Sequence, residues 1–470
     1  MANPVPTASA EGGLYELVAR GNKDAYFFQD EPDSKFLFDS SYDSQAVFSY
    51  EIRRVPPTTA PDFGRTVEFS FDLVGDVMRD PTILIQLPTW LPPEVASIAH
   101  KSIIAETPST TGVTYGYTQG IAYWLFETIQ LYQDNILLQE FTSETLWALG
   151  KAHGTYGHTF VTSQLTGDEK ADPAPGLLRL QLPLIGCQGS ADPGFPQRGC
   201  INHSYRLRCK TRRLEDIVEA SDGHIKPTPW DRTMYIKTSA ANPFTSFSTL
   251  KRQDIAPPIL KLETTQVYVE RGIQDALASK PMQLPFKRYF TNTFSQNKKD
   301  YLSVIGGGTS PLTRRIDGRH PTSRILWFFR SQHDTDANRL WKISTPTNGP
   351  YYNTTSLIIA GQARELPRSP MVWRDVTNHA KEEIDTGIEL SSMNWTLGAI
   401  APLRFPTAGS SGAEQPTGAI NMTTADRPTF YIDAANPGLS IPMTTLFVIT
   451  EGWGVFETDG RGNADLMSQN

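Results

Sequence analysis

Hydrophobic and polar residues alternate along several segments of this chain. In residues 65–74, the apolar side chains of Val67, Phe69 and Phe71 are separated by single polar residues. A period of two over this length predicts a β-strand with one buried face. Residues 82–87 are more continuously apolar, which favours a second, more deeply buried strand. The same patterns predict further strands at residues 177–184, 204–212 and 266–270.

Turn and cap residues mark the ends of other elements. Residues 127–132 and 136–139 are rich in apolar residues, and the polar turn 133–135 joins them. This arrangement predicts a β-hairpin. Residues 143–149 predict a short helix that begins at a Ser or Thr cap and ends before Gly150.

A second block of strands follows a segment that lacks strand alternation. That segment, residues 271–285, contains Pro281 and Pro285, so we expect a linker there. Long polar loops separate the later strands, and loops of this length are uncommon unless they act at a surface. The later strands are predicted at 323–330, 356–360, 388–391, 429–433 and 444–450, with loops at 306–318, 331–353 and 402–418. We therefore predict an arm with a short helix (1–44), a first β-domain (45–270), a linker (271–285) and a second β-domain (286–470).

Composition agrees with a folded chain of two β-domains. A chain of 470 residues is longer than a domain with a single hydrophobic core usually is, so we expect two domains. The chain is 39% hydrophobic, as globular proteins are, and its 35 glycines and 35 prolines suit strands joined by many loops. We therefore predict an all-β protein of two consecutive β-sandwiches. Jelly-roll, immunoglobulin-like and lectin-like sandwiches all fit this pattern.

Charge and cysteine content exclude several classes of protein. The net charge of −7 argues against direct nucleic acid binding, which needs a basic surface. No apolar run approaches the roughly 20 residues of a membrane-spanning helix. Residues 1–13 carry no basic region before an apolar stretch, so we expect no secretory signal. Three cysteines do not suggest a disulfide framework, so we expect folding in a reducing compartment.

Six phrases occur in the same order as in one known protein family. They lie at residues 12–24, 36–38, 123–137, 178–184, 320–328 and 416–422. His320 and Pro321 lead into the apolar run that contains Trp327, and Pro416 and Gly418 lead to Asn421. In these phrases the chain resembles the double jelly-roll major capsid proteins of large nucleocytoplasmic double-stranded DNA viruses, of the algal-virus and iridovirus type.

The resemblance implies an architecture and a function. Two jelly rolls would stand side by side in one chain, and three chains would form a pseudo-hexagonal capsomer that tiles an icosahedral shell over an internal membrane. The protein would be a structural part of the virion, assembled in the host cytoplasm, with no catalytic activity and no cofactor. Its partners would be further copies of itself, minor capsid proteins, a penton protein and the membrane surface.

Two alternatives remain open at this point. One is a minor capsid protein of the same fold. The other is a carbohydrate-binding or carbohydrate-active β-sandwich protein, which nine tryptophans and many loops would also suit. Sequence cannot place two carboxylates at catalytic separation, so it identifies no carbohydrate-cleaving site.

Two groups of residues are candidate contact surfaces. The first group begins in residues 13–20, whose apolar residues recur at helical spacing. It would form an inward-facing anchor that contacts minor capsid proteins or the membrane. Alternatively, it would pack beneath its own domain. The second is a basic face along a predicted strand. It would contact an acidic neighbour or anionic lipid heads, or remain an ordinary solvated sheet face. The anchor comprises Leu14, Tyr15, Leu17, Val18, Tyr26, Phe27 and Phe28, and the basic face comprises Arg206, Arg208, Lys210, Arg212 and Arg213.

One group of residues has the chemistry of a zinc site. Cys187, Cys200, His203 and Cys209 are residue types that bind zinc, but their spacing matches no common zinc motif. Cys209 also falls on the apolar phase of its predicted strand. Buried thiols are therefore the favoured interpretation, and we predict neither a metal site nor catalytic residues.

Overall fold

In the part of the chain that the structure describes, sixteen strands form two sets of eight. The computed structural model describes residues 48–71, 73–97, 103–152, 171–188, 193–237, 243–297, 312–318, 321–376, 389–395, 418–422, 425, 427–434 and 443–467. The first set is β1 (Phe48–Val55), β2 (Thr66–Ser70), β3 (Val77–Gln86), β6 (Phe126–Gln133), β7 (Ile136–Thr142), β8 (Leu177–Gln181), β9 (Tyr205–Thr211) and β13 (Ile259–Val269). The second set is β14 (Met282–Asn297), β15 (Leu312–Arg315), β16 (Pro321–Ser331), β17 (Tyr352–Ile359), β18 (Gln362–Arg368), β19 (Ser391–Asn394), β21 (Thr429–Ala434) and β22 (Met443–Thr458).

Both sets have the same strand order. In the first, β1-β13-β3-β8 form one sheet and β2-β9-β6-β7 form the other. In the second, the sheets are β14-β22-β16-β19 and β15-β21-β17-β18. Numbered one to eight within its set, each half has the orders 1-8-3-6 and 2-7-4-5 with antiparallel pairs. In the second roll, β20 (Ile420–Asn421) and β23 (Ala464–Leu466) add to the first of these sheets by pairing with β16 and β22. Two sheets connected in this order form a jelly roll, so the predicted all-β double jelly roll is confirmed.

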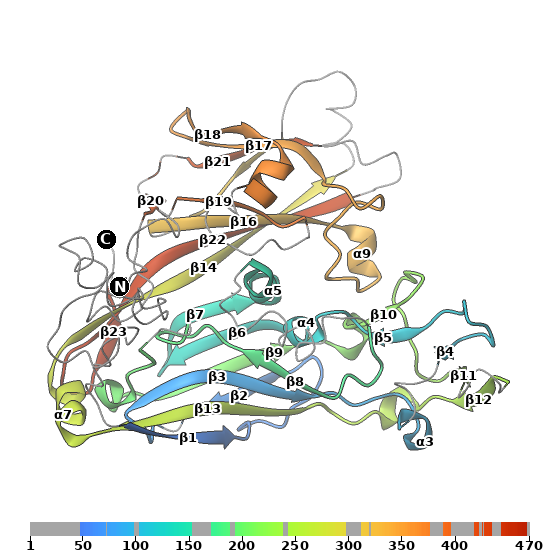
Figure 1. Cartoon of the computed structure of the whole chain (residues 1–470), viewed down its shortest axis with the longest axis horizontal. Helices are drawn as coiled ribbons and strands as arrows, with labels where there is room; N and C mark the ends of the chain where they lie inside the picture. Colours follow the sequence, from blue (N-terminus) through green and yellow to red (C-terminus); the bar gives the residue numbers. More distant parts are fainter. Residues whose placement is uncertain are drawn as a thin grey trace, which may run out of the picture.

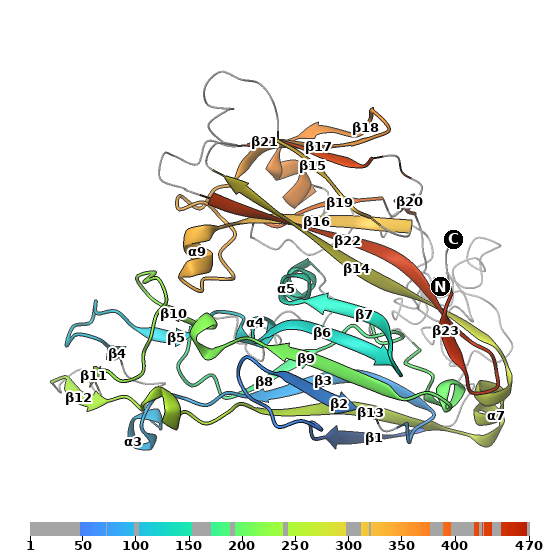
Figure 2. The same cartoon turned by 180° about the vertical axis from the view of Figure 1, so that it is seen from behind.

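The four sheets stack in one direction (Figures 1 and 2). We name them in the order of the stack. The first outer sheet is β1-β13-β3-β8, and the first inner sheet is β2-β9-β6-β7. The second inner sheet is β14-β22-β16-β19, and the second outer sheet is β15-β21-β17-β18. The two inner sheets face each other across the middle of the molecule.

Helices, turns and shorter strands complete the described part of the fold. The helices are α3 (Pro93–Ala96), α4 (Ile121–Trp124), α5 (Ser143–Ala152), α7 (Arg271–Ser279) and α9 (Gln332–Asp336), with a π-helical turn at Val372–Val376. Short 3-10 turns lie at Gln197–Cys200, Leu214–Asp216 and Arg252–Asp254. The remaining strands are β4 (Ile103–Ala105), β5 (Tyr115–Tyr117), β10 (Val218–Ala220), β11 (Thr233–Lys237), β12 (Thr245–Ser248), β20 (Ile420–Asn421) and β23 (Ala464–Leu466).

The predicted linker at residues 271–285 differs from the structure. It contains helix α7, and β14 already begins at Met282, so the second set of strands starts four residues before the predicted position. Pro285 lies inside β14, which pairs only with β22 and is therefore an edge strand. An edge strand tolerates a proline because one side of its backbone makes no ladder hydrogen bonds. Among the described strands, those before and after α7 never share a sheet.

Helix α5 corrects a second expectation. Its cap is confirmed, because the Thr142 hydroxyl accepts a hydrogen bond from the Thr145 amide at 3.2 Å. Gly150, however, lies inside the helix, which continues to Ala152. A Cβ atom at Gly150 would collide with the ring and hydroxyl of Tyr123. This glycine therefore permits close packing and does not end the helix.

Candidate assembly surfaces

A hydrophobic core joins the two jelly rolls. The rings of Phe141 on β7 and Tyr289 on β14 lie 5.9 Å apart. Trp147 on α5 makes an edge contact with Phe328 on β16, with ring centroids 5.4 Å apart. These side chains belong to one buried cluster that contains residues of both rolls. The two rolls are therefore packed as one body through their inner sheets.

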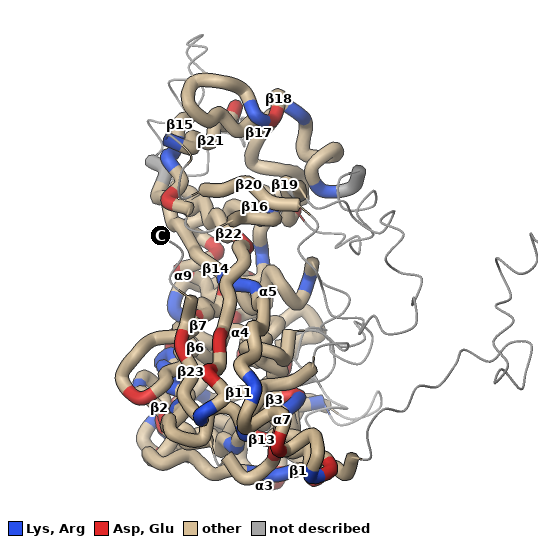
Figure 3. The backbone as a smooth tube through the Cα atoms, turned by 90° about the vertical axis from the view of Figure 1, so that its left-hand side faces the viewer, with Lys and Arg blue, Asp and Glu red and all other residues tan. Residues whose placement is uncertain are grey.

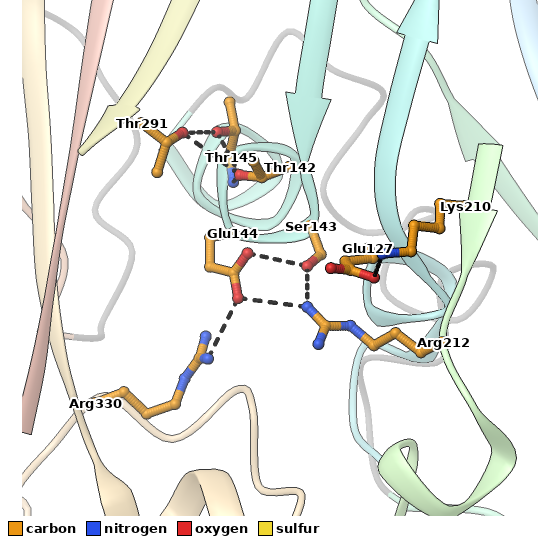
Figure 4. A network of polar contacts seen from close by, with 9 residues as sticks. All are labelled: Glu127, Thr142, Ser143, Glu144, Thr145, Lys210, Arg212, Thr291 and Arg330. Atoms are coloured by element: carbon orange, nitrogen blue, oxygen red, sulfur yellow. Dashed lines mark hydrogen bonds and ion pairs between the residues drawn. The ribbon is translucent and has the colours of Figure 1, made fainter. Parts of the chain in front are cut away.

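A buried ion cluster lies at the same interface (Figure 4). Glu144, in the first turn of α5, contacts Arg330 of β16 at 3.4 Å and Arg212 at 3.6 Å. Its own roll also supplies Ser143, whose hydroxyl donates to the Glu144 carboxylate and accepts from Arg212. The Glu144 and Arg330 side chains are only 12% and 2% exposed. The cluster therefore links the rolls through charges that have little access to water.

The charges within this cluster favour an ionised Glu144 and a charged Arg330. Burial by itself raises the pKa of Glu144, but Arg330 and Arg212 outweigh burial and hold the pKa below its usual range. Burial lowers the pKa of Arg330, against the opposing effect of Glu144. The Arg330 guanidinium also lies 5.0 Å from the Trp124 ring of the first roll and 4.9 Å from the Phe447 ring of the second. Aromatic faces on both sides favour the charged form of Arg330.

Further polar contacts cross the interface. The Thr145 and Thr291 hydroxyls are 2.7 Å apart. The Gln188 side chain, from the first roll, accepts from the amide of Lys287 at 2.6 Å and donates to its carbonyl at 2.7 Å. Lys287 is part of β14, so Gln188 occupies backbone groups of an edge strand. This pairing covers part of the β14 edge.

Two segments of the second roll reach across to the first. After α9, the Asn338 side chain donates to the carbonyls of Glu215 and Val218, each at 2.7 Å. At the other end of the molecule, the Gln133 side chain donates to the carbonyl of Ala464 at the start of β23. The predicted long loop at 331–353 is therefore partly an inter-roll contact.

The predicted basic face is largely neutralised within the chain. Arg208 pairs with Glu68 at 2.8 Å, and Lys210 pairs with Glu127 at 2.7 Å. Arg206 donates to the Asp134 carbonyl and the Asn135 side chain. Along the described chain as a whole, Figure 3 shows Lys and Arg interspersed with Asp and Glu. Arg212 belongs to the inter-roll ion cluster, and Arg213 is exposed beyond the end of β9.

The structure brings together two of the family-like phrases. Pro321, the first residue of β16, pairs with Asn421 of β20. Gly418 lies just before β20, and Trp327 lies at the centre of the second core, with Phe430 and Trp373 5.0 and 5.9 Å away. The two phrases thus meet on one sheet. His320 and Pro416 lie outside the described residues, as do the anchor candidates Leu14, Tyr15, Leu17, Val18, Tyr26, Phe27 and Phe28.

The zinc-like residues do not gather into a site. Cys187, Cys200 and Cys209 are buried and form no disulfide, and burial raises the pKa of Cys200 to about 12. His203 bonds through Nδ1 to Asp134 at 2.7 Å. Within the described part of the chain, no three His, Cys, Asp or Glu side chains are grouped to hold a metal ion. None of the helices described here is long and apolar enough to cross a membrane.

Sequence reasoning missed one exposed apolar surface. Phe48, Tyr50 and Ile52 of β1 are 63%, 68% and 59% exposed. They alternate with Ser49, Glu51 and Arg53, and this alternation was the available signal. Strand β1 lies at the edge of the first outer sheet, at one end of the stack (Figure 1).

Comparison with known proteins identifies the fold but no close relative. No protein-family model matches the chain, and no curated protein matches its sequence. Among solved structures, VP54 of the virus PBCV-1 is similar, with a TM-score of 0.65 and 11% identity over 93% of this chain and 100% of VP54. The Faustovirus major capsid protein has a TM-score of 0.61 and 12% identity over 90% and 93% of the two chains. A chain of the Sputnik virophage has a TM-score of 0.52 and 10% identity over 90% and 89%. The chain thus has the double jelly-roll fold of the major capsid proteins of large DNA viruses.

Proposed function

We propose that the protein is a structural subunit of a viral capsid and acts by self-association without catalysis. The observation that carries this proposal is the pair of jelly rolls with identical strand order, packed through one shared core. Six similar domains approximate a hexagon when three such chains close around a threefold axis. The capsomer would then tile an icosahedral shell in the virion. Similarity of fold to the PBCV-1 and Faustovirus capsid proteins supports this role.

The proposal includes partners and a place of assembly. Trimers would contact each other, minor capsid proteins and a penton protein, and the shell would enclose an internal membrane. Assembly would take place in the host cytoplasm. Residues 1–44 would form an arm and residues 45–270 the first roll. The second roll, predicted as residues 286–470, would begin at Met282, where β14 begins.

The mass of the purified protein in solution tests the proposal. We expect light scattering to give about three times the chain mass of 52.2 kDa, and negative-stain images to show hexagonal outlines. A folded monomer without such outlines would contradict a major capsid role. Glycan binding by that monomer would instead favour the carbohydrate-binding alternative.

A further inference from the structure

A groove lies along the seam between the two jelly rolls. It is formed by β7, an edge strand of the first inner sheet, and β14, an edge strand of the second (Figure 1). The two strands run in the same direction, since Phe141 packs against Tyr289 and the next contact joins the hydroxyls of Thr142 and Thr291, which are 3.4 Å apart. The groove has a volume of about 400 Å³, which is within the usual range for a binding site.

The residues that line the groove are consecutive, and this shows that it opens onto strand edges. Residues 137–142 of β7 and 288–292 of β14 all contribute, together with Asp317. Successive side chains of a strand point to opposite faces of its sheet, so only an edge presents consecutive residues to one space. Among the described strands, β7 pairs only with β6 and β14 only with β22. Alternate residues of β7 therefore turn their backbone N–H and C=O groups away from β6, on its edge side.

Gln188 shows how a peptide group binds at this seam. Its side-chain carboxamide has the same donor and acceptor as a peptide group. It accepts a hydrogen bond from the amide of Lys287 at 2.6 Å and donates one to the carbonyl of the same residue at 2.7 Å. A neighbouring antiparallel strand makes this pair of bonds with every second residue of an edge. Gln188 thus occupies one position of an edge strand in the way that an added strand occupies several.

We propose that the groove binds an extended segment of a second polypeptide, which adds to the edge of β7 and lies along β14. Main-chain hydrogen bonds hold the segment, as in other cases of β-strand addition. A polypeptide backbone repeats its donors and acceptors at the spacing of a strand edge, so it suits the groove better than a small ligand does. Residues 137–142 span about 20 Å, which is the length of about six extended residues. The inference is separate from the proposed capsid role.

Charge at the rims of the groove selects the side chains of the segment. Glu140 on β7 is exposed, as is Asp317, whose backbone is hydrogen-bonded to the Asn292 side chain of β14. Neither carboxylate makes an ion pair with another described residue. Arg288 also lines the groove, and its guanidinium lies 5.7 Å from the centre of the Phe290 ring. Two carboxylates and one guanidinium leave an excess of negative charge beside apolar surface, which favours a segment of alternating basic and apolar residues.

Short synthetic peptides test the inference on the purified protein in its native oligomeric state. The probe is a fluorescein-labelled peptide of about seven residues in which valine and lysine alternate. One control has glutamate in place of lysine, and the other has every amide N-methylated, so that it cannot donate main-chain hydrogen bonds. We expect fluorescence anisotropy to show that the lysine peptide binds at least about tenfold more tightly than either control. Equal binding of the three peptides, or no saturable binding of the lysine peptide, would overturn the inference.

Two variants of the protein locate the bound peptide. We expect Glu140→Lys to weaken binding of the lysine peptide at least about fivefold, because it replaces attraction at the groove by repulsion. Glu94→Lys is the matched control, since Glu94 is also exposed, makes no ion pair with a described residue, and lies on α3 outside the groove. Both variants change the net charge equally, so equal weakening in both would contradict a site at Glu140.

Hydrogen exchange provides a second measurement at the strand itself. We expect the lysine peptide to slow amide exchange in Ile136–Thr142 of β7 and to leave Phe48–Val55 of β1, another edge strand, unchanged. Binding without slower exchange in β7 would overturn the groove as the site. So would β7 amides that a segment of the same chain already protects and that do not respond to the peptide. None of these measurements requires a trimer, so their failure would leave the proposed function intact.

Discussion

The ion cluster between the rolls allows the most demanding test of the interface. Changing Glu144 to Gln keeps the size of the side chain and removes its charge. At 3.4 and 3.6 Å and an effective dielectric constant of about 20, each arginine contact is worth about 5 kcal/mol before desolvation is subtracted. Removing one partner of a buried pair typically costs about 3–5 kcal/mol. We expect a loss of about 3 kcal/mol, because Gln retains one acceptor oxygen.

Chemical denaturation followed by tryptophan fluorescence measures this loss. Trp124 and Trp147 are buried beside the cluster and would report its opening. Glu127→Gln is the control, because the Glu127–Lys210 pair is about half exposed and should contribute less than about 1 kcal/mol. Adding Arg330→Met to Glu144→Gln should restore much of the lost stability, since it removes the unpaired buried charge. Equal denaturation midpoints for Glu144→Gln and the parent would refute this reasoning.

The same cluster sets a dependence of stability on pH. The pKa of Glu144 is lower in the folded protein than in the unfolded chain, where a glutamate titrates near 4.3. Its contribution is therefore complete above that pH and is lost as the pH falls through the lower, folded value. We expect the difference in stability between the parent and Glu144→Gln to be constant near neutrality and to shrink below about pH 4. A difference that grew on acidification would contradict the assigned direction.

Three further outcomes are expected from the packing. Trp327→Ala should destabilise the second roll by about 3–5 kcal/mol in urea denaturation, because Trp327 is fully buried at the centre of its core. Gly150→Ala should also destabilise, by about 1–3 kcal/mol, despite the higher helix propensity of alanine, and shortening Tyr123 to Leu should recover part of that loss. The three cysteines should be unreactive towards a thiol reagent in the native protein and react together on unfolding; a fast-reacting native thiol would show that one is accessible.

Alternation of apolar and polar residues predicted the strands that have one face in a core. Residues 204–212 contain β9 (Tyr205–Thr211), whose Leu207 and Cys209 are buried and alternate with basic residues. Residues 429–433 correspond to β21. The pattern located such strands because burial within one roll is recorded in the local sequence. The strand predicted at residues 388–391 was placed less accurately, since β19 spans Ser391–Asn394 and is largely polar.

The contact between the rolls could not be predicted in this way. Glu144 and Arg330 are 186 residues apart, and nothing near either residue identifies its partner. Gly150 was predicted to end helix α5, because a glycine after a helical segment commonly does so. The residue that requires a glycine at this position is Tyr123, which belongs to helix α4 and is not identified by the sequence around Gly150. The partners of the basic face could not be predicted for a related reason: Glu68 and Glu127, which pair with Arg208 and Lys210, lie on neighbouring strands and not beside these residues in sequence.

The shared core between the rolls bears on how a ring could form. If a flexible linker alone joined the rolls, the angle between them would vary, and a head-to-tail contact could continue into open chains of varying length. Here Trp147, Phe328 and the Glu144–Arg330 pair hold the inner sheets together. The step from one roll to the next is thereby fixed before any second copy arrives. Variants that loosen this interface, such as Glu144→Gln, should therefore assemble into a broader range of oligomers than the parent protein.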